Sequence, residues 1–198
     1  MNKMKTAAKL LDRIMSVLYW LALISTAFIL LCTVFFALVS GIPDLLRQSS
    51  VAVPLGSLLV TLRPEAVPAG AEKTVLFLSV YQLICMPLYC LILLTIRDAL
   101  KPYINGEPFH ETVAKNLKRL AILLTVHTLL EWLSQRILYR IVTEVYDMTL
   151  VFNMENVISF ASKNGASLMP LLFAGALYLL SKVFLYGQEL QQLSDETL

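Results

Sequence analysis

Hydrophobic positions are concentrated in four stretches of this chain. Residues 14–39 and 74–96 are uncharged runs of 26 and 23 residues, and about 20 helical residues cross the hydrocarbon core of a bilayer. The first run exceeds the about 7–15 residues of a signal-peptide core, so we expect it to be retained. Residues 120–142 and 165–183 are also apolar on average. The pattern predicts an all-α integral membrane protein, a single domain over residues 1–198 with four transmembrane helices.

The stretch 120–142 holds unusual polar side chains. His127, Glu131 and Gln135 recur at i, i+4 and i+8, so they share one helix face. Ionisable residues at membrane depth usually face a bundle interior or a wet cavity. This polar stripe could relay a proton or bind a cation. The same stripe is also typical of hydrogen bonds between helices, or of a helix end that reaches the headgroups.

An adjacent face of the same stretch carries Trp132, Arg136 and Arg140. Tryptophan is typical of the membrane interface, and arginine can extend toward it from near a helix end. These residues indicate that the third span leaves the bilayer in this region.

The distribution of Lys and Arg predicts the topology. Residues 1–13, 97–119 and 184–198, with the adjoining Lys182, hold ten of them, whereas 40–73 and 143–164 hold four. Basic residues accumulate on the cytoplasmic side. We therefore expect a multi-pass protein of the bacterial cytoplasmic membrane. Both termini and segment 97–119 would lie inside, and 40–73 and 143–164 outside.

Each outer segment contains a stretch with strand character. Residues 55–62 are β-prone and lie between prolines, and residues 146–154 alternate at the period of a strand. We expect these stretches to pair as a small extracellular β cap on the helix ends.

The inner segment contains a turn followed by a helix start. Asn105-Gly106 is a turn signal and Pro108 suits a position near a helix start. Val113 and Leu117 then begin an apolar face, with basic residues directed elsewhere. We expect either an interfacial helix start that sets topology or a docking surface for a cytoplasmic partner.

The composition of the chain excludes several classes of protein. The chain is 58% hydrophobic and 15% charged, with a net charge of +2, which is not the footprint of a nucleic-acid-binding protein. The three cysteines lie in apolar runs, where Cys behaves as a small hydrophobe. Sequence signatures of hydrolases, P-loops and zinc sites are absent. We expect no enzyme, cofactor, metal site or direct nucleic-acid binding.

Two motifs carry a family resemblance. Asn105-Gly106-Glu107-Pro108-Phe109 is followed by a short helix, and the chain closes on Val183-Phe184 and Gly187 with Asp195-Glu196-Thr197. Together with the hydropathy, they resemble a bacterial four-span membrane family catalogued as a domain of unknown function. The resemblance implies an integral membrane protein that is often encoded beside a small Cro/CI-like helix-turn-helix regulator.

We expect a regulatory or signalling membrane protein, and the resemblance implies that it controls such a cytoplasmic regulator. The alternative is a small transporter, channel-like or immunity protein that uses the polar stripe. The expected partners are the lipid bilayer and the regulator, and a homo-oligomer is compatible with the sequence. The candidate cytoplasmic partner surface comprises Gly106, Pro108, Phe109, Lys115, Lys118, Arg119, Gly187, Asp195 and Glu196.

Overall fold

The computed structural model is mostly helical (81%) and includes a small three-stranded sheet. It describes residues 2–38, 50–55, 58–68, 70–106, 110–151, 153, 155–162 and 167–196, with the side chains of 2–4, 36–38, 148, 150 and 195 set aside.

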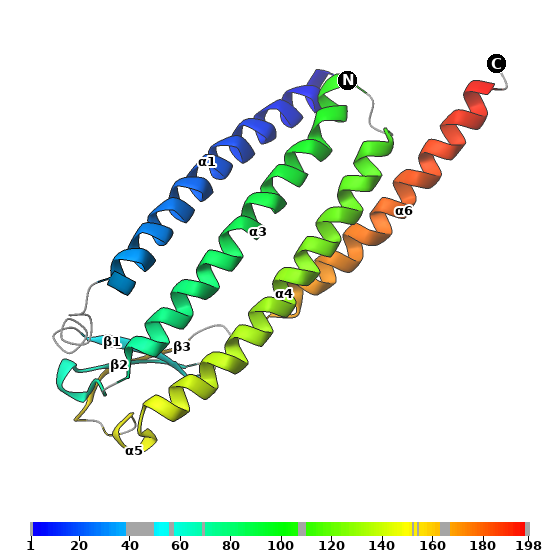
Figure 1. Ribbon diagram of the computed structural model, residues 1–198. Coiled ribbons are helices and arrows are strands. Elements are labelled where there is room, and N and C mark those ends of the chain that lie inside the picture. The colour runs from blue at the N-terminus through cyan, green and yellow to red at the C-terminus, as the bar shows by residue number, and fades with distance from the viewer. Residues whose placement is uncertain are drawn as a thin grey trace. The chain divides into compact units, whose positions relative to one another are not determined.

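Four long helices dominate the structure (Figure 1): α1 (Asn2–Leu38), α3 (Glu72–Asn105), α4 (Glu111–Val145) and α6 (Met169–Glu196). Helices α3 and α4 contain the predicted spans 74–96 and 120–142, and α1 and α6 contain most of the predicted spans 14–39 and 165–183. All four helices also include residues outside these spans. At a rise of 1.5 Å per residue, even the 28 residues of α6 extend for about 40 Å, which exceeds the hydrocarbon thickness of a bilayer.

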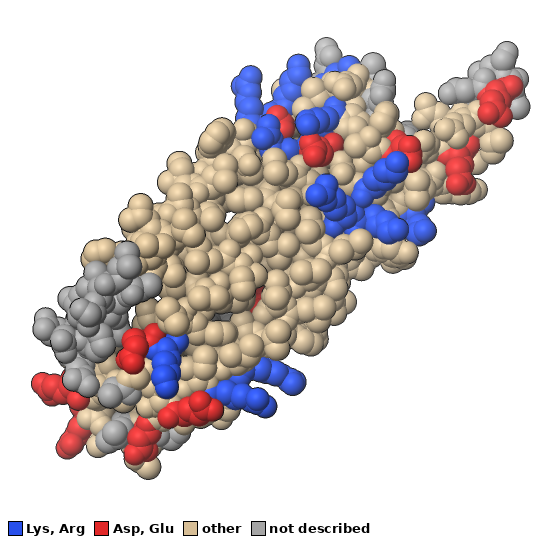
Figure 2. All heavy atoms as spheres, in the orientation of Figure 1, with Lys and Arg blue, Asp and Glu red and all other residues tan. Residues whose placement is uncertain are grey.

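Three of these helices are long and apolar enough to cross a membrane, over Lys5–Phe35, Glu72–Asn105 and Met169–Ser194. Their apolar side chains are largely exposed; Phe28 of α1, for example, is 69% exposed. Large apolar surfaces of this kind are unfavourable in water. The charged surface is also uneven, since Figure 2 shows Lys, Arg, Asp and Glu gathered near helix ends, with uncharged surface between them. The structure therefore supports a membrane protein.

The third predicted span, 120–142, is not confirmed by the same criterion. It lies in α4, which is not among the three helices that are apolar enough. The reason is composition, because Glu131, Arg136 and Arg140 interrupt its apolar run.

The chain divides into two compact units. Unit 1 comprises Met1–Thr26, Cys85–Thr128 and Leu168–Leu198, and unit 2 comprises Ala27–Ile84 and Leu129–Ser167. The helices α1, α3 and α4 each contribute residues to both units.

Unit 2 contains the sheet. Strands β1 (Val51–Leu55), β2 (Leu58–Leu62) and β3 (Val157–Ser162) are antiparallel in the order β1-β2-β3. Because β2 comes from segment 40–73 and β3 from segment 143–164, the predicted pairing of the two segments is confirmed.

The predicted position of the second strand was wrong. Within residues 146–154 the structure has a short helix, α5 (Met148–Val151), and the strand lies further along the chain. Asp147 explains the difference, because its Oδ1 accepts hydrogen bonds from the Thr149 N–H (2.9 Å) and the Thr149 hydroxyl (2.7 Å). An aspartate in this position caps a helical turn. These hydrogen bonds also lower the pKa of Asp147.

The core of unit 2 joins the sheet to helix ends. Val53 and Val60 face each other across β1 and β2, and both are fully buried. They cluster with Val142 of α4 and with Tyr146, which follows it. The cluster also includes Leu62, Val67, Ala71, Leu138, Val151 and Val157. Burial of these side chains stabilises the sheet, since two or three short strands alone would be marginal. The 3₁₀-helix η1 (Pro64–Ala66) connects β2 toward α3.

Unit 1 contains the start of α1, the turn between α3 and α4, and α6. Tyr103 of α3 and Phe184 of α6 lie edge to face with ring centroids 6.4 Å apart. The start of α4 follows the predicted pattern: Val113 is buried and Leu117 is half-buried, whereas the basic side chains between and after them are exposed.

Helix α3 continues through Pro87, as membrane helices can when neighbouring groups satisfy the freed carbonyl.

Candidate functional site

The turn between α3 and α4 is built on Gly106. Its N–H donates to the Pro102 carbonyl at 2.9 Å and its φ is +94°, a conformation that favours glycine. Lys5 of α1 reaches this turn, and its Nζ donates to the Asn105 carbonyl at 3.5 Å. A cation is favourable at a helix C-terminus, where carbonyl groups lack helical partners. The predicted turn at Asn105-Gly106 is confirmed.

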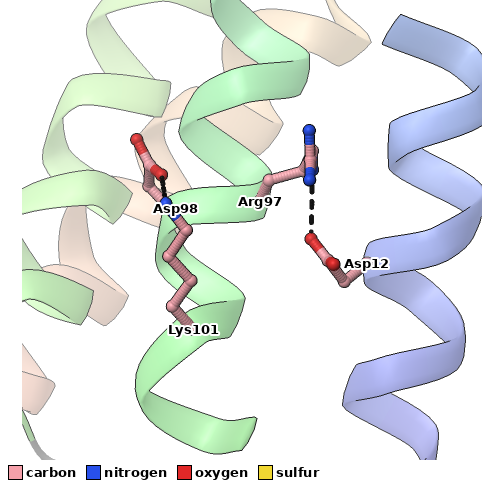
Figure 3. Close-up of polar contacts among 4 residues, drawn as sticks. All are labelled: Asp12, Arg97, Asp98 and Lys101. Atoms are coloured by element: carbon pink, nitrogen blue, oxygen red, sulfur yellow. Dashed lines mark hydrogen bonds and ion pairs between the residues drawn. The ribbon is translucent and has the colours of Figure 1, made fainter.

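An ion pair joins α1 and α3 (Figure 3). Arg97 Nε donates to Asp12 Oδ1 at 3.0 Å, and both side chains are about one-quarter exposed. From the sequence, Arg97 was expected only to favour the cytoplasmic side, and no partner was predicted for it or for Asp12. The signal that could have revealed the pair is their position, because each lies within two residues of an uncharged run. Antiparallel helices place such positions at one level.

Other charges near the turn form local pairs. Lys101 lies 2.6 Å from Asp98, one turn earlier on α3 (Figure 3), and Lys115 lies 2.6 Å from Glu111 on α4. The hydrogen bond and charge of Lys115 lower the pKa of Glu111. In contrast, Lys118 and Arg119 are exposed and form no ion pair with any described residue. These two cations are therefore available to an external anionic group.

A polar hollow of about 350 Å³ adjoins these charges. Its lining combines acceptors, donors and a cation: Asp98, Lys101, Pro102, Asn105, His110, Thr112 and Asn116. The His110 Nδ1 accepts a hydrogen bond from the Thr112 N–H at 3.2 Å, and the buried Asn116 Nδ2 has no protein partner. The hollow could receive a polar side chain of a partner.

In the part of the chain that the structure describes, the remaining members of the predicted partner surface do not extend this site. Pro108 and Phe109 lie outside the described residues, as does the side chain of Asp195. Gly187 is half-buried on α6, and Glu196 is exposed at its last residue. Among the described side chains, none of the tail acids forms an ion pair with Lys115, Lys118 or Arg119.

The predicted polar stripe lies on α4, with its members in different settings. In unit 1, the ring centroid of His127 is 4.8 Å from that of Tyr89, and its Nε2 is buried without a hydrogen-bond partner. In unit 2, Glu131 and Gln135 are half-buried. No group of three metal-ligating side chains occurs among the residues that were described.

No protein-family model, curated protein or solved structure matches this chain. The resemblance of the turn and the tail to a four-span membrane family therefore stays a prediction.

Proposed function

We propose that this chain is a four-span regulatory membrane protein in which a folded cap on one side of the bilayer is connected by helices to a partner-binding surface on the other. The observation that carries the proposal is the pairing of β2 with β3, which ties the beginning of α3 to the end of α4.

The first step concerns the number of crossings. β2 precedes α3 and β3 follows α4, and the two strands are hydrogen-bonded neighbours. The chain that leaves the sheet along α3 must therefore return to it along α4. Because α3 is apolar enough to cross the membrane and α4 has 35 residues, α4 can make the return crossing despite its lower hydropathy. The polar stripe is tolerated if it faces other helices.

The second step concerns orientation. The turn between α3 and α4 lies among five basic residues of segment 97–119, and the start of α1 contributes Lys5 directly to it. Basic residues of short loops favour the cytoplasmic side. Both termini and the α3–α4 turn would then be cytoplasmic, and the sheet would be outside.

Reporter fusions test this arrangement. A cytoplasm-active reporter should function at both termini, and a periplasm-active reporter should function when inserted between β1 and β2. Activity of opposite reporters at the two termini would contradict the four-span topology.

The third step concerns function. The exposed pair Lys118 and Arg119 offers cations to a soluble protein, and the polar hollow lined by Lys101 and His110 offers a recess at the α3–α4 turn. The sheet offers a separate surface to an external signal. The partner favoured by the sequence resemblance is a small helix-turn-helix regulator, which the membrane protein would hold or release.

Pull-down from native membranes tests the partner, and the proposal expects a small helix-turn-helix regulator among the captured proteins. Lys118→Gln with Arg119→Gln should reduce the captured regulator at equal membrane yield, because two exposed cations are removed. Arg63→Gln, an exposed cation in the other unit, is the matched control and should have no effect. Unchanged capture by the double variant would contradict the assigned surface.

A second candidate function has its own observation. The buried, unpartnered His127 Nε2 beside Tyr89 is the kind of group that a transporter or channel uses to bind a solute or move a proton. In this case His127→Ala and Glu131→Gln would abolish flux into proteoliposomes while the Lys118 and Arg119 variants stay active. The regulatory proposal expects the reverse dependence.

A further inference from the structure

The second half of α4 presents an arginine pair that no described side chain neutralises. Arg136 and Arg140 are both exposed and occupy successive turns on one side of the helix. Neither forms an ion pair within the described part of the chain, and Glu144, one turn further, is not bonded to Arg140. Figure 2 shows basic side chains projecting from the surface over this part of α4. Two adjacent guanidinium groups attract an anion.

The surroundings of the pair are apolar and aromatic. Leu129 and Leu133, which are 56% and 55% exposed, continue the same side of α4 toward its middle. Trp132 and Tyr139 are also exposed and, with the arginines, line a shallow hollow of about 680 Å³. Aromatic rings of this kind are typical of the membrane interface. The helix thus presents an apolar strip that leads to two cations, with aromatic rings beside both.

We propose that this surface binds an anionic phospholipid. The phosphate would lie on the guanidinium groups of Arg136 and Arg140, which can donate paired hydrogen bonds to phosphate oxygens. One acyl chain would lie along Leu133 and Leu129. The inference rests on α4 lying against the bilayer, as in the proposed function, but needs no cytoplasmic partner.

Charge complementarity selects this occupant. A soluble anion would satisfy the arginines but leave the apolar strip uncovered, and a neutral lipid would cover the strip but supply no net charge. Only an anionic amphiphile satisfies both parts. The site also accounts for two arginines at a membrane end where the distribution of charge predicts few.

Native mass spectrometry of the detergent-purified, full-length protein tests the proposal. The probes are phosphatidylglycerol and phosphatidylcholine with identical acyl chains. The wild type should bind phosphatidylglycerol more tightly. Arg136→Gln with Arg140→Gln should weaken that binding by about fivefold per arginine, the factor that corresponds to about 1 kcal/mol per basic residue. Phosphatidylcholine binding should change little.

Controls separate the alternatives. Arg63→Gln should leave binding unchanged. Arg136→Lys with Arg140→Lys keeps the charge but not the paired donors, so its affinity should be intermediate; it also serves as the decisive variant if the glutamine pair does not fold. Three results would overturn the proposal: equal binding of both lipids, equally tight binding of soluble glycerol phosphate, or a change in oligomeric state in place of lipid loss.

Discussion

Asp12 of α1 and Arg97 of α3 are 85 positions apart in the sequence and are joined by a 3.0 Å contact between the carboxylate and Nε. Each residue lies next to an uncharged run of its helix, so the contact fixes the level of α1 against α3. The same end of α1 brings Lys5 to the α3–α4 turn. The positions of Asp12 and Lys5 along α1 thus determine which groups of α3 each of them contacts.

Removal of one member of this pair should lower stability. Asp12→Asn or Arg97→Gln should each cost about 1 kcal/mol, since both groups retain some solvent contact. The exchanged variant, Asp12→Arg with Arg97→Asp, should recover part of the loss. Reversible unfolding in mixed micelles measures the free energy. Equal losses that simply add in the double replacement Asp12→Asn/Arg97→Gln would contradict a direct interaction.

Gly106 is predicted to be sensitive because of its backbone. At φ +94° an alanine side chain is strained, so Gly106→Ala should destabilise the protein by about 1 kcal/mol. A new Cβ would also lie 2.9 Å from Lys5 Nζ, but that flexible side chain can move away. Gly175 of α6 has open space around its Cβ position, so Gly175→Ala is a suitable control and should not destabilise. Thermal unfolding of both variants checks this difference.

Tyr146 should be the most sensitive position in the core of unit 2. It is 2% exposed and packs among residues from the sheet and α4. Tyr146→Ala would remove a large buried ring and should cost about 3–5 kcal/mol. Tyr146→Phe keeps the ring, so most of the stability should remain. Burial raises the pKa of Tyr146, and the tyrosine absorbance should therefore titrate partly above the usual range. Ordinary titration of all tyrosines would contradict this burial.

Glu111 provides a prediction about pH. The pKa of Glu111 is lowered, first by a hydrogen bond from Lys115 and second by the positive charge of Lys115. A lowered pKa in the folded state means that the ionised carboxylate stabilises the start of α4 above its ordinary pKa, and that this contribution is lost as the pH falls through the lowered value. Carboxyl chemical shifts of labelled glutamate in micelles report the titration. Lys115→Met should move the pKa of Glu111 upward.

The sequence predicted the elements that depend on local pattern. The long apolar runs lie in helices, the Asn105-Gly106 turn ends α3, and the division of buried and exposed side chains after Val113 follows from helical periodicity. The pairing of the two outer segments was also predictable, because 55–62 has strong strand character and a strand in one segment needs a partner strand from the other. Local pattern is sufficient to predict an element when that element's own side chains decide which of its faces is buried.

Contacts between elements were less predictable. The strand expected at 146–154 was misplaced because its alternation does not reveal the cap that Asp147 forms with Thr149. The Asp12–Arg97 pair depends on how two helices align, which hydropathy alone does not determine. Hydropathy also left the crossing by α4 undecided, whereas the pairing of β2 with β3 argues for it.

Cysteine cross-linking in living cells should test both the register of the sheet and its side of the membrane. Leu59 and Ala161 are directly opposite on β2 and β3, a separation that a disulfide can bridge. In a background with the three native cysteines replaced by alanine, Leu59→Cys with Ala161→Cys should form a disulfide spontaneously if the sheet lies outside, because that compartment is oxidising.

The control is Leu59→Cys with Ser159→Cys, which shifts the second cysteine by two residues along β3. Diagonal positions are about 7–8 Å apart, so this pair should cross-link much less. A shift in gel mobility after protease cleavage between the strands measures the bond. Equal cross-linking of both pairs would contradict the register. If the opposed pair links only after an oxidant is added to broken cells, the sheet lies in the cytoplasm and the orientation must be reversed.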